Sequence, residues 1–203
     1  MTDDPTTKLA TLTQQIITCK KCPLHKKRTN AVPGEGAVNA ELLFIGEGPG
    51  SEEDRLGRPF VGAAGKLLTE MLESIELPRT QVFIANIVKC RPPNNRDPEP
   101  AEIDACRDYL NEQIKLIQPK LIILLGRHSL NCFLPGQRIS EAHGKVFRRK
   151  NGQHFLPLYH PAAALYSPSQ RPAHLTDFRK IPQILSQIKK KSSSQQVAQA
   201  KLF

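Results

Sequence analysis

The sequence lacks several features that would place the protein in a familiar class. No apolar run approaches the length of a membrane-spanning helix, and the first residues do not show the basic segment followed by an apolar one that marks a signal peptide. No internal repeat is evident. Because the sequence shows neither a membrane-spanning run nor a signal peptide, we expect a cytoplasmic protein that does not bind a membrane.

Acidic residues are few beside the basic ones. The 203 residues include 19 Asp and Glu against 29 Lys and Arg, which gives a formal net charge of +10. This excess favours a polyanionic partner, and nucleic acid is the natural candidate because neutralised phosphates give affinity for any sequence. The alternative is a basic surface that only keeps the protein soluble. The basic residues gather in two clusters, Lys20, Lys21, Lys26, Lys27 and Arg28 in the first and Arg148, Arg149 and Lys150 in the second.

Four apolar runs bounded by turn residues read as strands, and helical patterns lie between them. The expected strands are residues 41–46, 82–88, 120–126 and 155–160, and the expected helices include residues 61–77 and about 99–118. Strands that alternate with helices indicate an α/β domain whose parallel sheet is covered on both faces. We place this domain at residues 1–188. Residues 189–203 are basic, polar and low in complexity, which is typical of a disordered tail.

The carboxyl ends of the predicted strands carry polar residues, and function in parallel sheets gathers at these ends. Glu47 lies in the glycine-rich turn after the first strand, Asn86 near the end of the second, and His160 after the fourth. The turn is not a common phosphate-binding loop, because no Gly-Lys-Ser/Thr follows it. A carboxylate, an amide and an imidazole would thus meet at one edge of the sheet. Alone, Asn86 could equally be a satisfied buried amide and His160 a plain turn residue.

Four cysteines are spaced as metal ligands would be. Cys19 and Cys22 form a C-x-x-C pair, while Cys90 ends an apolar run and Cys106 lies early in a predicted helix. Four thiolates from separate segments can complete a tetrahedral sulfur site, which means zinc or an iron–sulfur cluster, and in a cytoplasmic protein metal is favoured over disulfides. The alternative is four unrelated thiols. Cys132 follows an apolar stretch and is expected to be a small core residue.

Four segments together resemble one known family. Residues 46–54, 57–62, 85–95 and 160–165 are similar to the motifs of the family 4 uracil-DNA glycosylases, and the four cysteines occur in the same order. The resemblance implies a three-layer sandwich with a central four-stranded parallel sheet. It also implies a [4Fe-4S] cluster on the four cysteines. The expected activity is base excision repair: flipping uracil out of DNA and hydrolysing its N-glycosidic bond, which leaves an abasic site.

The resemblance also assigns roles in a uracil pocket. Phe60, which alone could be a core residue, would stack on the base; Asn86 would read N3–H and O4; and His160 would donate to O2 as charge develops there. Preorganised donors of this kind are worth roughly 3–4 kcal/mol each. Some relatives place a water-orienting aspartate where this chain has Gly48, so Glu47 is the first candidate for a catalytic and substrate-positioning role. The Gly48 backbone is expected to touch the uracil edge.

Further residues are expected around this pocket. Glu53 would help exclude the thymine methyl group. Leu165 and Tyr166 resemble the loop that fills the gap left by the flipped base, because apolar wedges stabilise an unstacked step; the alternative is that Leu165 only caps the core. Phosphate contacts are expected from Lys66, Arg91, Arg96 and Arg171. The cluster should tie the N-terminal segment to the sheet and take no part in the reaction, since hydrolysis transfers no electrons.

The last residues suggest a partner. Gln199, Leu202 and Phe203 are similar to the short peptides with which repair proteins bind sliding clamps, and an apolar anchor on a disordered tether suits capture by a groove. We expect a monomer associated with the nucleoid. Two alternatives remain open at this point: a non-catalytic, zinc-stapled DNA-binding module, and a glycosylase of the same fold with broader specificity for deaminated bases.

Overall fold

The computed structural model describes residues 4–167, 169 and 171–200, those after 191 by their backbone alone. A mixed sheet with the strand order β1-β3-β2-β4-β6-β5 forms the middle layer. Its strands are β1 (Glu35–Gly36), β2 (Leu42–Gly46), β3 (Phe83–Asn86), β4 (Leu121–Leu125), β5 (Phe147–Arg148) and β6 (His154–Leu158). The four inner strands pair in parallel, which confirms the predicted four-stranded parallel sheet, and the two short edge strands pair antiparallel.

The inner strands are buried on both faces. Every residue of β2, β3 and β4 is buried, and their sequences are almost continuously apolar. This is the pattern of a parallel sheet with helices on both sides, where strands need not alternate between polar and apolar residues. The register places Gly46 opposite Asn86, so the ends of β2 and β3 lie side by side.

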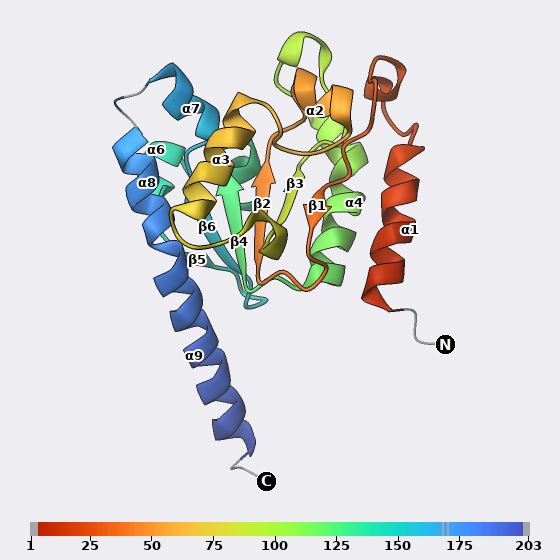
Figure 1. Cartoon of the computed structure of the whole chain (residues 1–203). Helices are drawn as coiled ribbons and strands as arrows, with labels where there is room; N and C mark the ends of the chain where they lie inside the picture. The colour runs from red at the N-terminus through yellow and green to blue at the C-terminus, as the bar shows by residue number, and fades with distance from the viewer. Residues whose placement is uncertain (1–3, 168, 170, 201–203) are drawn as a thin grey trace.

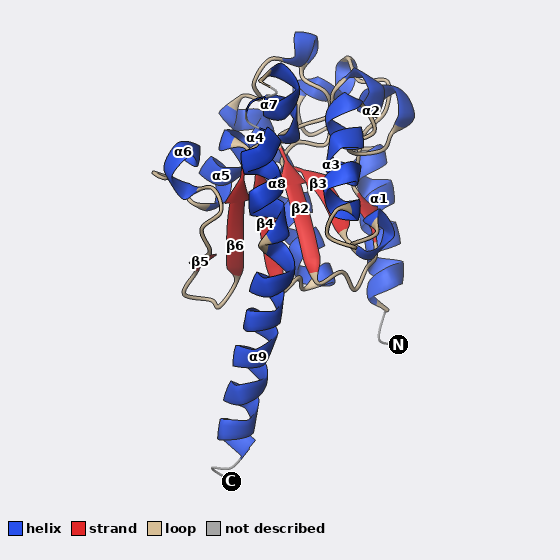
Figure 2. Ribbon diagram, turned by 60° about the vertical axis from the view of Figure 1, so that its left-hand side comes forward, coloured by secondary structure: helices blue, strands red, loops and turns tan. Residues whose placement is uncertain are grey.

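Helices cover the sheet as an α/β sandwich requires (Figures 1 and 2). The described α-helices are α1 (Pro5–Ile17), α2 (Ser51–Leu56), α3 (Ala63–Glu73), α4 (Pro100–Ile117), α5 (Arg127–Phe133), α6 (Ile139–Ala142), α7 (Pro161–Tyr166), α8 (Arg171–Arg179) and α9 (Ile181–Ala200), and the short 3₁₀ turns are η1 (Pro23–Lys26), η2 (Arg79–Gln81) and η3 (Pro93–Asn95). Apolar residues of α3, α8 and α9 pack on one face, those of α4, α5 and α6 on the other. α1 packs outside α4.

Helix α4 shows how local sequence sets an element's limits. Pro100 occupies the first turn, where its missing N–H costs nothing, and the carboxylate of Glu102 accepts the backbone N–H of Glu99 at 2.8 Å. The helix ends at Gln118, which adopts a left-handed conformation with φ of 52°. These signals explain why the prediction of a helix at about 99–118 is close to the observed limits.

The C-terminal segment differs from the prediction. Helix α9 begins at Ile181 and continues to Ala200, so it includes residues 189–200 of the segment 189–203 that was expected to be a disordered tail. It extends beyond the sheet, away from the end where α2 and α7 lie (Figures 1 and 2). Leu202 and Phe203 of the expected clamp peptide lie outside the described residues. No helix within the described part of the chain combines the length and apolar character needed to span a bilayer.

Candidate active site

A cavity of about 420 Å³ opens at the carboxyl ends of β2 and β3, where the sequence places its polar residues. All five residues of the predicted uracil pocket line it. The full lining is Glu47, Gly48, Pro49, Gly50, Glu53, Phe60, Ala64, Asn86, Pro92, Asn95, Arg96, Asp97, His160, Ala162 and Tyr166. Its volume is within the range of sites that bind small molecules.

Gly46 allows the Phe60 and Asn86 side chains to approach each other closely. A Cβ atom at this position would lie 2.5 Å from Asn86 Oδ1 and 2.6 Å from Phe60 Cζ. Glycine is therefore required here because two side chains press on the backbone, and not because of an unusual dihedral angle. Phe60 also belongs to the core cluster beneath the cavity, so it is a core residue that lines the cavity as well.

Asn86 is buried, yet its amide oxygen has no partner. The residue is 2% exposed, and no hydrogen-bond donor of the described residues reaches Oδ1. Its main chain is well held, because Lys89 Nζ donates to the Asn86 carbonyl oxygen at 2.9 Å. A buried polar atom without a partner costs free energy unless a ligand satisfies it, so the interpretation of Asn86 as a satisfied buried amide is wrong for this oxygen.

His160 caps helix α7 with its own ring. Its Nδ1 accepts the backbone N–H of Ala162 at 3.2 Å, and its ring lies 5.5 Å from the Phe60 ring, centroid to centroid. Burial lowers the pKa of His160 to about 4, although the Glu53 carboxylate opposes this change. The imidazole is therefore neutral near pH 7 and, with Nδ1 accepting, carries its proton on Nε2.

Glu47 extends from the end of β2 toward a group that the sequence analysis missed. Its Oε2 lies 3.5 Å from Nε2 of His128, and His128 Nε2 lies 3.3 Å from Asp97 Oδ1. Arg127 Nε donates to the same nitrogen at 2.8 Å. Burial raises the pKa of Glu47, and His128 partly offsets this. His128 follows the third predicted strand closely, so the strand-end rule could have found it.

Glu53 binds backbone groups and is only partly available to a ligand. Its Oε1 accepts the N–H groups of Val61 and Gly62 at 2.9 and 2.8 Å, and its Oε2 accepts that of Gly50 at 3.0 Å. Glu53 therefore joins the start of α2 to the chain that follows Phe60. It lines the cavity, as a group that excludes a methyl would, but its carboxylate is committed to holding the wall.

The expected DNA-binding side chains differ in their surroundings. Leu165 and Tyr166 are 44% and 88% exposed, so Leu165 does not cap the core. Arg171 pairs with Glu70 at 2.8 Å on the surface. Of the other basic residues proposed for phosphates, Arg96 binds the Glu102 carboxylate at 2.7 Å and lines the cavity.

All four predicted ligand cysteines line a second, small cavity between α1, η1, the chain after β3, and α4. Burial raises the pKa of the Cys22 and Cys90 thiols, and that of Cys106 to about 11. Arg28 Nη1 lies 3.0 Å from Cys90 Sγ as a donor, and Arg28 Nη2 donates to the Ile17 carbonyl at the end of α1. The Arg28 guanidinium thus faces one of a set of buried thiols whose neutral form is favoured by burial, and a bound metal would favour their thiolate form. Cys132 lies elsewhere, packed against the core.

The spacing of the sulfur atoms bears on which group would fit. Among the described residues, the one set of three or more ligand atoms of His, Cys, Asp or Glu within 4.8 Å of one another is that of Glu47, Asp97 and His128. No three cysteine sulfurs are that close. A single zinc ion with Zn–S bonds of about 2.3 Å would bring its sulfurs to ~3.8 Å from one another. The described cysteines do not form such a close set, so they are not arranged as a preformed single-zinc site.

The fold and the site define a pocket at the carboxyl ends of a parallel sheet, large enough to receive a small molecule. The comparisons with known proteins identify the family. The family described as "Uracil DNA glycosylase superfamily" matches residues 33–183. The type-4 uracil-DNA glycosylase of Sulfurisphaera tokodaii is 52% identical over 185 residues, spanning 87% of this chain and 84% of the relative.

Two further relatives carry the same name. That of Archaeoglobus fulgidus is 49% identical over 181 residues, spanning 85% of this chain and 91% of the relative, and that of Thermotoga maritima is 45% identical over 156 residues, spanning 76% and 81%. The chain belongs to the uracil-DNA glycosylase superfamily and, within it, to the type-4 uracil-DNA glycosylases. It is a hydrolytic glycosylase of DNA repair, so the alternative of a non-catalytic DNA-binding module is set aside.

Proposed function

We propose that the cavity receives uracil extruded from DNA, with Phe60 stacking on the ring, Asn86 reading its edge and His160 stabilising the leaving base. A base inside a duplex is out of reach of side chains and must first be rotated out, at a cost of a few kcal/mol. The observation that carries this proposal is the buried, unpartnered Oδ1 of Asn86 in a cavity that Phe60 and His160 also line.

Asn86 distinguishes uracil from cytosine by the direction of its hydrogen bonds. Its Oδ1 accepts from uracil N3–H, and its Nδ2 donates to O4. Cytosine presents an acceptor at N3 and a donor at its amino group, so both bonds would meet the wrong partner. A site built for a given set of polar groups rejects analogues that leave its own groups unpaired.

His160 acts as a neutral donor. As the bond between the sugar C1′ and uracil N1 breaks, its electron pair moves into the ring and onto O2, where Nε2–H donates a hydrogen bond. The sugar becomes cationic at C1′ and is attacked by water, which loses a proton and leaves an abasic site. A preorganised donor is most effective in a site that excludes water, and Phe60 and the walls of the cavity provide this.

Glu47 is the carboxylate nearest to the position that some relatives use to orient water. It lines the cavity. Burial favours its neutral form, so the ionisation of this carboxylate depends on the charged groups around it. Gly48 lines the same wall and has no side chain that could do this work. Replacement of Glu47 by Gln tests the role: single-turnover cleavage should fall at least about hundred-fold. Near-normal cleavage would remove Glu47 as the group that activates water.

The exposed pair Leu165 and Tyr166 would enter the duplex beside the flipped base, with Arg171 close enough in the chain to reach a phosphate. Tyr166 lines the cavity, and an exposed apolar side chain next to it suits a wedge. Leu165→Ala should therefore slow cleavage of double-stranded uracil DNA several-fold more than that of single-stranded DNA. Equal effects on both substrates would contradict the wedge.

The group held by Cys19, Cys22, Cys90 and Cys106 is a [4Fe-4S] cluster. The common cavity and the cationic Arg28 support it. When bound, the cluster supplies cross-links between segments and no step of hydrolysis. Iron and sulfide analysis of the purified protein should give equal amounts, at four per chain, whereas zinc without sulfide would overturn the assignment.

Three expectations concern partners and place. Gln199, Leu202 and Phe203 would bind a sliding clamp, and deletion of residues 199–203 should abolish clamp binding while leaving uracil excision intact. The enzyme would act as a monomer, which size-exclusion chromatography coupled to light scattering tests. Because its substrate is DNA, the enzyme would act at the nucleoid in the cytoplasm.

Broader specificity is tested by oligonucleotides that contain hypoxanthine, which the uracil-reading amide should reject.

A further inference from the structure

The stacking residue Phe60 has an unusual backbone. Its φ of 49° is in the left-handed region, which a bulky aromatic residue rarely adopts. Conformations of this kind persist only where the surrounding contacts determine them, and they gather at functional sites. On the C-terminal side, Glu53 accepts the N–H groups of the next two residues, Val61 and Gly62.

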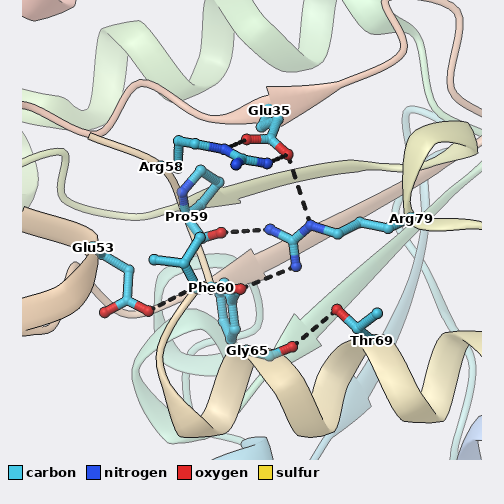
Figure 3. Close-up of polar contacts among 9 residues, drawn as sticks. Glu35, Glu53, Arg58, Pro59, Phe60, Gly65, Thr69 and Arg79 are labelled. Atoms are coloured by element: carbon cyan, nitrogen blue, oxygen red, sulfur yellow. Dashed lines mark hydrogen bonds and ion pairs between the residues drawn. The ribbon is translucent and has the colours of Figure 1, made fainter. Parts of the chain in front are cut away.

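Arg79 holds the same turn by its carbonyl groups. It lies in the η2 turn before β3, and its Nη1 donates to the Phe60 carbonyl oxygen at 3.0 Å while its Nη2 donates to that of Pro59. Figure 3 shows the guanidinium group between these two oxygens and the carboxylate of Glu35. The planar fork of arginine presents two donors in a fixed geometry to two adjacent acceptors, whereas a lysine offers a single, freely rotating ammonium group.

Helix α3 presses on the turn from another side. A Cβ atom at Gly65 would lie 1.9 Å from the Phe60 carbonyl oxygen, so this helix comes into direct contact with the backbone of Phe60. The carbonyl therefore has little freedom to turn elsewhere, and its direction suits the bond from Arg79.

Glu35 fixes the position of Arg79. Its Oε1 lies 3.7 Å from Arg79 Nε, and the same carboxylate binds Arg58 through Nε at 2.6 Å and Nη2 at 2.9 Å. The Arg79 side chain is only 18% exposed, whereas that of Arg58 is 60% exposed. Two arginines thus share one carboxylate. Of these two, Arg79 donates to the carbonyl groups of Pro59 and Phe60.

We propose that Arg79, oriented by Glu35, is a positioning residue that holds Phe60 in its left-handed conformation and so keeps its ring against the uracil face. The inference rests on the proposed stacking role of Phe60. Without the guanidinium group, the backbone relaxes toward a common conformation and the ring leaves the position next to Gly46. Base binding and alignment for cleavage are then lost together.

The experiment is a double-mutant cycle on single-stranded uracil DNA under single-turnover conditions. Arg79→Gln should lower the cleavage rate at least about ten-fold, since small misplacements at a site cost rates of this size. Arg79→Lys should recover part of it. Arg58→Gln is the matched control: it loses the same carboxylate partner but no contact with the turn, and its rate should stay within about two-fold of wild type.

The informative arm uses the Phe60→Leu background. If Arg79 acts through the Phe60 ring, Arg79→Gln should slow Phe60→Leu less than about two-fold, because coupled residues are not additive. An equal fold-loss in both backgrounds would overturn the inference and leave Arg79 a purely structural residue. Full activity of Phe60→Leu alone would instead refute the stacking role itself. Should Arg79→Gln not fold, Glu35→Gln takes its place in the same cycle, with the same predicted loss of effect in the Phe60→Leu background.

Discussion

His160 accepts a hydrogen bond at Nδ1 from the backbone N–H of Ala162, 3.2 Å away. This bond caps helix α7 and at the same time decides which ring nitrogen carries the proton. Pro161, at the first helical position, leaves the cap free to bind the next N–H. A single local contact in the sequence His-Pro-Ala therefore begins a helix and also leaves Nε2 as the donor that the proposed mechanism requires.

The low pKa of His160 makes stability depend on pH. Its folded pKa of about 4 lies below the ordinary value of 6.5, so its contribution is complete above pH 6.5 and is lost as pH falls toward 4. This contribution is up to roughly 3 kcal/mol. His160→Asn keeps a side chain that can cap the helix but removes the titration. Urea unfolding should show the stability difference between wild type and His160→Asn shrinking over this range; a constant difference would argue against the shifted pKa.

Glu47 and His128 predict how the rate depends on pH. Cleavage that needs the Glu47 carboxylate falls as pH decreases through its raised pKa, and His128 counters that raise. Replacing His128 by Asn should therefore move the acid limb of the single-turnover profile to higher pH. In Glu47→Gln the limb should disappear along with most of the activity. An unshifted limb in His128→Asn would show that another group titrates.

Gly46→Ala should damage the site through two neighbours at once. The added Cβ would meet Asn86 and Phe60 at 2.5 and 2.6 Å, and overpacking of this kind costs about 1–3 kcal/mol of stability. The rate should fall by at least about hundred-fold because both uracil contacts shift. Gly136→Ala is the control, since its φ of 85° makes the substitution strained but no atom lies within 4 Å of the new Cβ. Equal rates in the two variants at equal stability would rule out the proposed packing.

The cysteine cavity predicts separate effects on stability and chemistry. Cys106→Ser removes one buried thiol next to α1 and η1, and we expect loss of iron and of visible absorbance together with a fall in melting temperature. Hydrolysis needs no electrons, so the variant protein that remains folded should keep single-turnover cleavage of short single-stranded DNA within about ten-fold of wild type. Complete loss of cleavage in folded protein would give the cluster a role at the site.

Much of this structure can be predicted from the order of residues. The buried strands are continuous apolar runs, and the strand-end rule brings Glu47, Asn86 and His160 to one cavity. The edge strands escape prediction because two residues carry no periodic signal. Helix α9 continues through a polar segment whose composition suggested disorder. The role of Arg79 depends on the direction of two backbone carbonyls, which no side-chain pattern reveals.

The central claim is that the Asn86 amide reads uracil, and its isosteric replacement by Asp tests it most directly. An ionised carboxylate keeps the shape but loses the donor for O4 and repels that oxygen. Single-turnover assays with oligonucleotides containing one uracil, cytosine or thymine, followed by alkali, measure the outcome. The account predicts cleavage only at uracil by wild type, and a loss of at least about hundred-fold for Asn86→Asp, assayed at a temperature at which both proteins are folded. Equal uracil cleavage by the two proteins would contradict it.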